Sequence, residues 1–285
     1  MGVSRHEPAG PPGHRRWAWP ARLIIATAAI LAAGTAPDAV AATAPPVTIV
    51  GTNPPDLSNP TVMPDYTSST SPHWSGWYDQ ADANVHLRFV AADMFVPTVT
   101  CSDSSQYAYF WVGLDGVKDT PVEQTGIAVF CTGTTAYYYS FWEMYPGGLV
   151  IGGQVSPGDD IEMSVYYNAS FSDFSLSLTD LANSNANISA VQFCPSGQTC
   201  PRTSAEVIAE DPGAGPPGLQ LADFHEMGFA GITVTSQDGT HGTLEGNSLW
   251  SANMLTMAYN GTVMAQPGPR TDGSTAFADT WQNAG

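Results

Sequence analysis

The sequence predicts an all-β protein, a sandwich or barrel in a single domain. Short runs of β-branched and aromatic residues recur along the chain. Gly, Pro, Asp and Asn separate these runs, as they do in turns. No stretch shows the apolar periodicity of a convincing amphipathic helix. Regular short strands with turn signals between them are typical of sandwiches and barrels.

The chain begins with a predicted signal peptide, residues 1–41. Arg15, Arg16 and Arg22 precede an apolar stretch over residues 23–36, and Ala39-Val40-Ala41 offers a cleavage site. The adjacent arginines leave both general and twin-arginine export open. The apolar stretch is too short to span a membrane comfortably, and no second span of ~20 apolar residues follows. We therefore expect a secreted protein without a membrane anchor.

Residues 42–72 are rich in Pro, Thr, Ser and Asn, and we interpret them as a linker or propeptide. The β-domain is expected over residues 73–285. Its predicted strands are 85–89, 107–114, 126–131, 136–144, 161–167, 174–178, 205–210, 230–235 and 276–281.

The charge balance is strongly acidic. Loss of residues 1–41 removes four of the eight basic and two of the 26 acidic residues, which leaves a net charge of −20 at neutral pH. Nucleic acid is therefore not an expected partner. Because so few cations are present, protonation of the carboxyl groups builds little self-repulsion. The composition fits either an acid-tolerant protein or simply an acidic secreted one.

The four cysteines of this exported chain predict two disulfides. Cys194 and Cys200 flank a short Pro/Gly loop and are natural partners, which leaves Cys101 to pair with Cys131. Metal ligation is the weaker interpretation, because no histidine lies at ligand spacing from any of them.

Two polar residues in predicted strands are the candidate catalytic pair. Gln124 lies in Val122-Glu123-Gln124-Thr125-Gly126, and Glu210 ends the run 204–210. Polar side chains on a half-buried strand need a reason. Nucleophile-elbow and zinc-protease motifs are absent from the sequence. Glu206 shares the strand face of Glu210 but lies about 13 Å away, too far for a glycosidase pair.

The segment 137–146 alternates so that aromatic and acidic side chains fall on one face. Such a face is a candidate cleft, although the same aromatics can also fill the space between two sheets.

Taken together, these motifs resemble the glutamic peptidases of the eqolisin type, and the Glu-Gln and Trp-Glu-Met-Tyr-Pro forms resemble the bacterial branch of that family more than the fungal one. The resemblance covers the chain from Trp74 to the end and rests on segments that occur in the family's order: 74–77, Val96-Pro97, 111–116, 122–126, 141–146, Gly158-Asp159, 204–211 and 221–224.

The resemblance implies a concanavalin A-like β-sandwich of two antiparallel sheets, similar to lectins and glucanases. It implies Gln124 and Glu210 as the catalytic dyad, and no metal or cofactor. It also implies an extended polypeptide as substrate, and we expect a monomer. The positions that would line or support the substrate groove are Trp74, Trp111, Asp115, Glu143, Tyr145 and Glu206. The chain departs from the fungal pattern at Ala128, Tyr139 and Val207.

The chemistry expected of this dyad is hydrolysis in mild acid, where a glutamate of ordinary pKa about 4.3 is partly ionised. Glu210 would activate a water, and the Gln124 amide would donate to the developing oxyanion. Two rival interpretations remain: a carbohydrate-binding or glycan-hydrolysing sandwich, and a catalytically inactive surface module.

Overall fold

The computed structural model describes residues 55, 57–102, 106–213 and 220–285. The predicted signal peptide and most of the segment before residue 57 lie outside these ranges. The described residues form eighteen strands and one short 3₁₀ helix, so the predicted all-β class is confirmed. The elements are β1 Ser58–Val62, β2 Thr67–Ser71, β3 Trp74–Ala81, β4 Leu87–Phe95, β5 Gln106–Leu114, β6 Val122–Thr132, β7 Thr135–Tyr145, β8 Val150–Gln154, β9 Asp160–Asn168, β10 Asp173–Asp180, η1 Ser184–Ala186, β11 Ile188–Phe193, β12 Ser204–Glu210, β13 Gln220–Leu221, β14 Glu226–Ser236, β15 His241–Gly242, β16 Trp250–Tyr259, β17 Thr262–Pro267 and β18 Phe277–Trp281.

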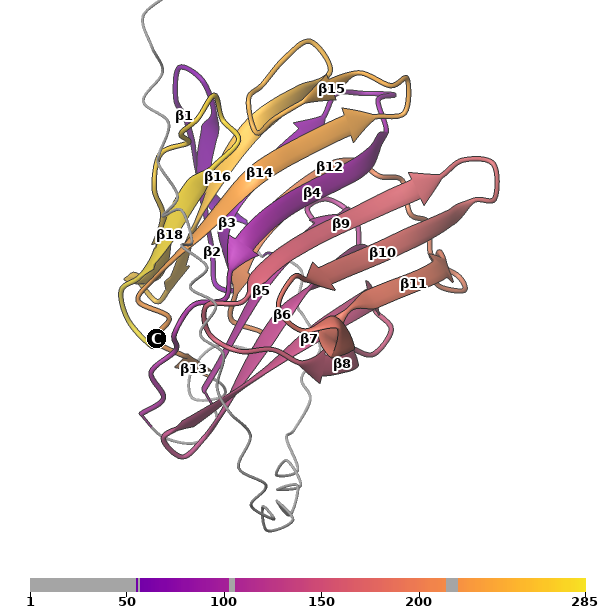
Figure 1. Cartoon of the computed structure of the whole chain (residues 1–285). Helices are drawn as coiled ribbons and strands as arrows, with labels where there is room; N and C mark the ends of the chain where they lie inside the picture. The colour runs from indigo at the N-terminus through magenta and orange to yellow at the C-terminus, as the bar shows by residue number, and fades with distance from the viewer. Residues whose placement is uncertain (1–54, 56, 103–105, 214–219) are drawn as a thin grey trace, which may run out of the picture. The chain divides into compact units, whose positions relative to one another are not determined.

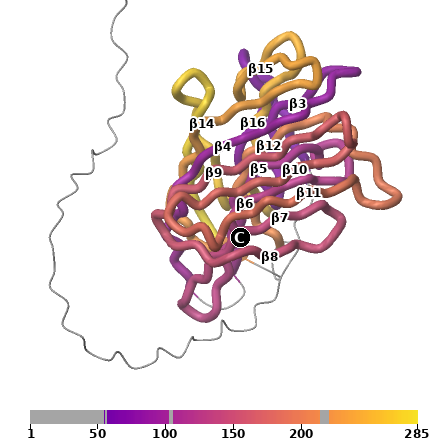
Figure 2. The backbone as a smooth tube through the Cα atoms, turned by 45° about the vertical axis from the view of Figure 1, so that its right-hand side comes forward, coloured from indigo at the N-terminus to yellow at the C-terminus, as the bar shows by residue number. Residues whose placement is uncertain are grey.

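The strands form two packed layers, as in a β-sandwich (Figure 1). The first layer follows the order β1, β2, β16, β3, β12, β5, β6, β7, β8. The second follows the order β17, β18, β14, β4, β9, β10, β11. The hairpin of β16 and β17 connects the layers. Figure 2 shows β4, β9, β10 and β11 side by side in the second layer. Pairing is antiparallel except for β2 with β16 and β13 with β5.

The core lies between the layers, and successive residues of β5 alternate between this core and the opposite face of the first layer. Phe110, Val112 and Leu114 alternate into the core cluster between the layers. Tyr109 and Trp111 point to the other face of the same sheet, where they join a second cluster of buried aromatic residues. Because every residue of β5 is buried, the strand is apolar on both faces. The first layer therefore has a buried outer face as well as an inner one.

The predicted domain start at residue 73 differs from the structure. Strands β1 and β2 lie within the segment 42–72 that the sequence indicated as linker or propeptide, and β2 pairs in parallel with β16. Their Ser- and Thr-rich sequences carry no apolar alternation, so their pairing depends on the edge that β16 offers. Strand β3 was also absent from the predicted strands. Its sequence contains the polar residues Ser75 and Asp79, and the structure buries both of them on the inner face of the strand.

Both disulfides of the sequence analysis are present, Cys101–Cys131 and Cys194–Cys200. The first connects the segment before β5 to the end of β6, and the second closes a loop after β11. No helix within the described ranges is long and apolar enough to cross a membrane.

Candidate active site

Gln124 and Glu210 lie on the same face of the first layer. Glu210 on β12 is paired with Tyr109 on β5, and Gln124 on β6 is paired with Gly113 on β5. Directly paired residues of antiparallel strands point to the same face, and Tyr109, Trp111 and Gly113 share one face by alternation. The predicted dyad therefore comes from two strands that only β5 separates, on the face that points away from the core.

The indole of Trp111 occupies the space between the two positions. Its Nε1 donates a hydrogen bond of 2.7 Å to Oε2 of Glu210. A Cβ atom at Gly113, the residue opposite Gln124, would lie only 2.8 Å from Cζ3 of this indole. The ring thus contacts the carboxylate at one side and covers the strand position beside Gln124 at the other.

Gly126 gives the indole the room it needs. A Cβ at this position would lie 2.6 Å from Cβ of Trp111 and 2.1 Å from the carbonyl oxygen of Phe110, closer than packed atoms approach. The glycine of the Gln-Thr-Gly sequence is therefore a packing requirement of Trp111.

Glu143 on β7 lies directly opposite Gln124 in the β6–β7 pair. The Nε2 atom of Gln124 donates a hydrogen bond of 3.3 Å to Oε2 of Glu143, and both side chains are buried. Tyr145 follows two residues later on the same face and is half-buried at the end of β7. The face that segment 137–146 contributes is thus part of the same surface as the predicted dyad.

Trp74 completes the aromatic surroundings of Glu210. It is paired with Glu210 across β3 and β12, and its ring stands edge-on to Trp111 with centroids 4.8 Å apart. The Trp74 Nε1 atom is buried and has no hydrogen-bond partner among the residues that the structure describes. A buried donor of this kind is costly unless a ligand or water supplies the acceptor.

Glu206 lies in the same transverse row as Gln124, between Tyr78 of β3 and Gly113 of β5. It is fully buried, and burial raises the pKa of its carboxyl well above the usual value. Burial, together with the charge of Glu206, raises the pKa of Tyr78 to about 12. Because its own pKa is raised, the Glu206 carboxyl is neutral in acid and acts as a hydrogen-bonding group rather than as an anion.

Asp115 holds the strand that carries Glu210. It follows β5 with a left-handed φ of 66°, and its two carboxylate oxygens accept the backbone N–H groups of Thr203 at 2.7 Å and Arg202 at 2.8 Å. These bonds fix the start of β12 against the end of β5. Burial raises the pKa of Asp115 to about 7. The contacts favour a supporting role for Asp115, and direct binding of substrate by it stays a prediction.

Glu123 is a residue to which sequence reasoning gave no role. It is fully buried beside Asp115, and burial raises the pKa of its carboxyl well above the usual value. The charges of Asp115 and Glu206 act in the same direction. The sequence does contain a signal for Glu123, because it is an acidic residue inside a predicted strand, next to the candidate glutamine. Glu123 is paired with Leu114 of the core cluster, so it points to the core side of the sheet, opposite to the face that carries Gln124 and Glu206.

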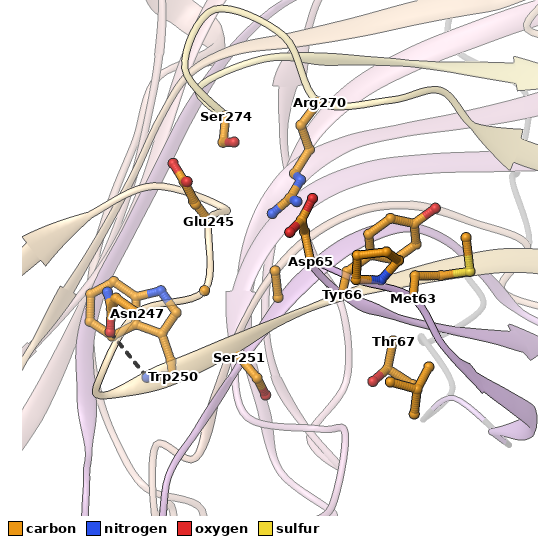
Figure 3. A pocket seen from close by; sticks show the side chains of 14 residues that line it. Met63, Asp65, Tyr66, Thr67, Glu245, Asn247, Trp250, Ser251, Arg270 and Ser274 are labelled. Carbon is orange, nitrogen blue, oxygen red and sulfur yellow. Dashed lines mark hydrogen bonds between the residues drawn. The ribbon is translucent and has the colours of Figure 1, made fainter.

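A separate hollow of about 590 Å³ lies at the edge formed by the β1–β2 turn and the loops around β16 (Figure 3). The Arg270 guanidinium points toward Asp65 across it, and Glu245 lies on its other side. None of the predicted site residues lines this hollow. No group of three or more His, Cys, Asp or Glu in the described part of the chain has the geometry of a metal site.

Comparison with solved structures shows the same fold. Scytalido-glutamic peptidase bound to a peptide-based transition-state analogue has a TM-score of 0.62 and 25% identity, covering 74% of this chain and 98% of that chain. SCP-B, an eqolisin in complex with the tripeptide Ala-Ile-His, has a TM-score of 0.60 and 24% identity, with the same coverage. Aspergilloglutamic peptidase from Aspergillus niger has a TM-score of 0.52 and 22% identity, covering 62% of this chain and 99% of that one. A search of curated protein sequences gave no match.

The family resemblance noted in the sequence is confirmed by a family model. The model of the Peptidase A4 family matches residues 72–276, which is most of the chain. This match and the neighbouring glutamic peptidase structures identify a peptide hydrolase with an eqolisin β-sandwich. The chain belongs to the Peptidase A4 family.

Proposed function

We propose that the protein is a secreted, acid-active endopeptidase that cleaves extended polypeptides with Gln124 and Glu210 and an activated water. The observation that carries the proposal is the shared strand face on which these residues flank the Trp111 indole. The predicted signal peptide and the two disulfides support export. No metal or cofactor enters the proposed mechanism.

In the proposed reaction, ionised Glu210 takes a proton from a water as the water attacks the scissile carbonyl carbon. The N–H donated by Trp111 holds the carboxylate and favours its charged form. Negative charge then grows on the carbonyl oxygen, and the Gln124 amide, which does not titrate, donates to it. Glu210 returns its proton to the amine nitrogen as the C–N bond breaks, which yields a carboxylic acid and an amine.

Acid conditions suit the rest of the face. Burial raises the pKa values of Asp115 and Glu206, so both are neutral in acid, and Glu206, in the same row as Gln124, places no net charge beside it. The aromatic side chains of this face supply the apolar contacts for an extended substrate.

The test is digestion of denatured casein by the purified mature protein between pH 2 and 7, with and without pepstatin. We expect cleavage that resists pepstatin and is lost in Glu210→Gln and in Gln124→Ala. Matched controls are Glu162→Gln and Gln154→Ala, which change exposed residues of β9 and β8 and should keep the wild-type rate. Wild-type cleavage by either dyad variant would refute the proposal.

A further inference from the structure

We infer that Glu143 is a positioning residue that turns the nitrogen end of the Gln124 carboxamide toward the scissile carbonyl oxygen. The inference rests on the proposed function and adds to it a residue that orients the oxyanion donor. Glu143 then acts through Gln124 rather than on the substrate.

The geometry of the β6–β7 pair carries the inference. Gln124 and Glu143 are directly opposite each other, fully buried, and joined by the bond from Nε2 to Oε2 of 3.3 Å. The next residue, Thr125, donates through Oγ1 to the backbone oxygen of Phe141 at 2.8 Å. This second bond between the same two strands fixes their register, so Glu143 is held at the position opposite Gln124.

A catalytic carboxamide needs such an orienting partner. Its two ends have nearly the same shape, but the oxygen would repel a developing oxyanion, whereas the nitrogen stabilises it. Rotation of the terminal torsion by 180° exchanges the two ends, and this torsion is soft. A carboxylate accepts hydrogen bonds and does not donate them when ionised, so it selects the nitrogen end. One bound hydrogen on Nε2 fixes the direction of the second, because both lie in the amide plane.

The two members of the dyad thus have different orienting partners on the same face. Trp111 of β5 binds the carboxylate of Glu210, and Glu143 of β7 binds the amide of Gln124.

The test is a double-mutant cycle on peptide hydrolysis at the pH of maximal activity, with Glu143→Ala, Gln124→Ala and the double variant. Loss of one oxyanion donor costs roughly 10²–10³ in rate, so we expect Gln124→Ala to fall within that range. Misorientation of the amide should cost less, about 10- to 100-fold in kcat with KM changed less than about threefold. The double variant should be no slower than Gln124→Ala within about twofold, because Glu143 has nothing left to orient.

A conservative variant separates positioning from folding. Glu143→Gln retains an acceptor oxygen of the same reach, so it should recover at least about a tenth of the wild-type kcat, and thermal unfolding of each variant shows whether the fold is kept. Full additivity in the cycle, or a Glu143→Gln variant as slow as Glu143→Ala, would overturn the inference while the dyad stands. If Gln124→Ala keeps the wild-type rate, the proposed function fails, and this inference fails with it.

Discussion

Asp279 tests how buried carboxyl groups couple the stability of this fold to pH. It lies on β18 in the core between the layers, is fully buried, and accepts a hydrogen bond of 3.0 Å from Ser75 Oγ on β3. Its other oxygen, Oδ2, has no partner among the described residues. Burial raises the pKa of Asp279 from 3.8 to about 7, against a smaller opposing effect of the Ser75 bond.

Because the pKa of Asp279 is higher in the folded chain than in the unfolded chain, this residue makes the protein less stable as the pH rises. Below about pH 4 the carboxyl is protonated in both the folded and the unfolded chain, and the full stability is present. Between about pH 4 and 7 the unfolded chain ionises while the folded chain does not, so the free energy of unfolding falls as the pH rises. A shift of about three units corresponds to a loss of about 4 kcal/mol by pH 7.

The perturbation is Asp279→Asn, which keeps the shape and the acceptor for Ser75 but removes the titration. We expect the variant to match the wild type within about 1 kcal/mol at pH 3.5 and to exceed its stability by up to about 4 kcal/mol at pH 7. For a domain of this size that is an increase of about 10 °C in Tm. Asp272→Asn, in an exposed turn, is the matched control and should leave the pH dependence unchanged.

The assay is chemical unfolding followed by tryptophan fluorescence at pH values from 3 to 8, with the disulfides intact. Parallel stability curves for wild type and Asp279→Asn across this range would refute the reasoning. So would an Asp279→Asn variant that is destabilised equally at both ends of it.

Two further predictions concern the surroundings of the dyad. Trp111→Phe keeps a ring but removes the N–H that Glu210 accepts, so the acid side of the rate profile should move to higher pH. An unmoved profile would contradict the assignment of this bond to the active base. Gly126→Ala forces a methyl group against the Trp111 side chain and the neighbouring backbone, and we expect a loss of about 1–3 kcal/mol in unfolding free energy together with reduced kcat. Gly148→Ala, where a Cβ meets nothing within 4 Å, is the control for both measurements, and equal behaviour of the two glycine variants would show that the space at position 126 is not needed.

The sequence predicted which site residues of a single strand share a face. Alternation placed Glu206 and Glu210 on one face, and it placed the aromatic residues of segment 137–146 with Glu143. Period-two alternation is a local property of the backbone, so a sequence specifies it without knowledge of any partner strand. The disulfide pairing was equally accessible because the short loop between Cys194 and Cys200 left a single remaining pair.

Which strands lie side by side could not be derived from residue patterns alone. The register of β12 against β5 and of β5 against β6 brings Gln124 and Glu210 to one face. The first of these pairings joins residues that are 91 to 101 positions apart in the sequence, from Ala205 with Leu114 to Glu210 with Tyr109. The burial of Glu123 was missed for the same reason. A buried carboxyl is recognised by its surroundings, and these come from other strands.

The sequence by itself determined the all-β class, the positions of most central strands, the disulfide partners and the two polar residues that needed an explanation. Tertiary structure alone decided that β1 and β2 join the sheet, that β3 buries Ser75 and Asp79, and that Trp111 binds Glu210 while Glu143 binds Gln124. The division has one physical cause: strand formation and face alternation are local, whereas pairing, burial and cross-strand hydrogen bonds exist only after distant segments have packed together.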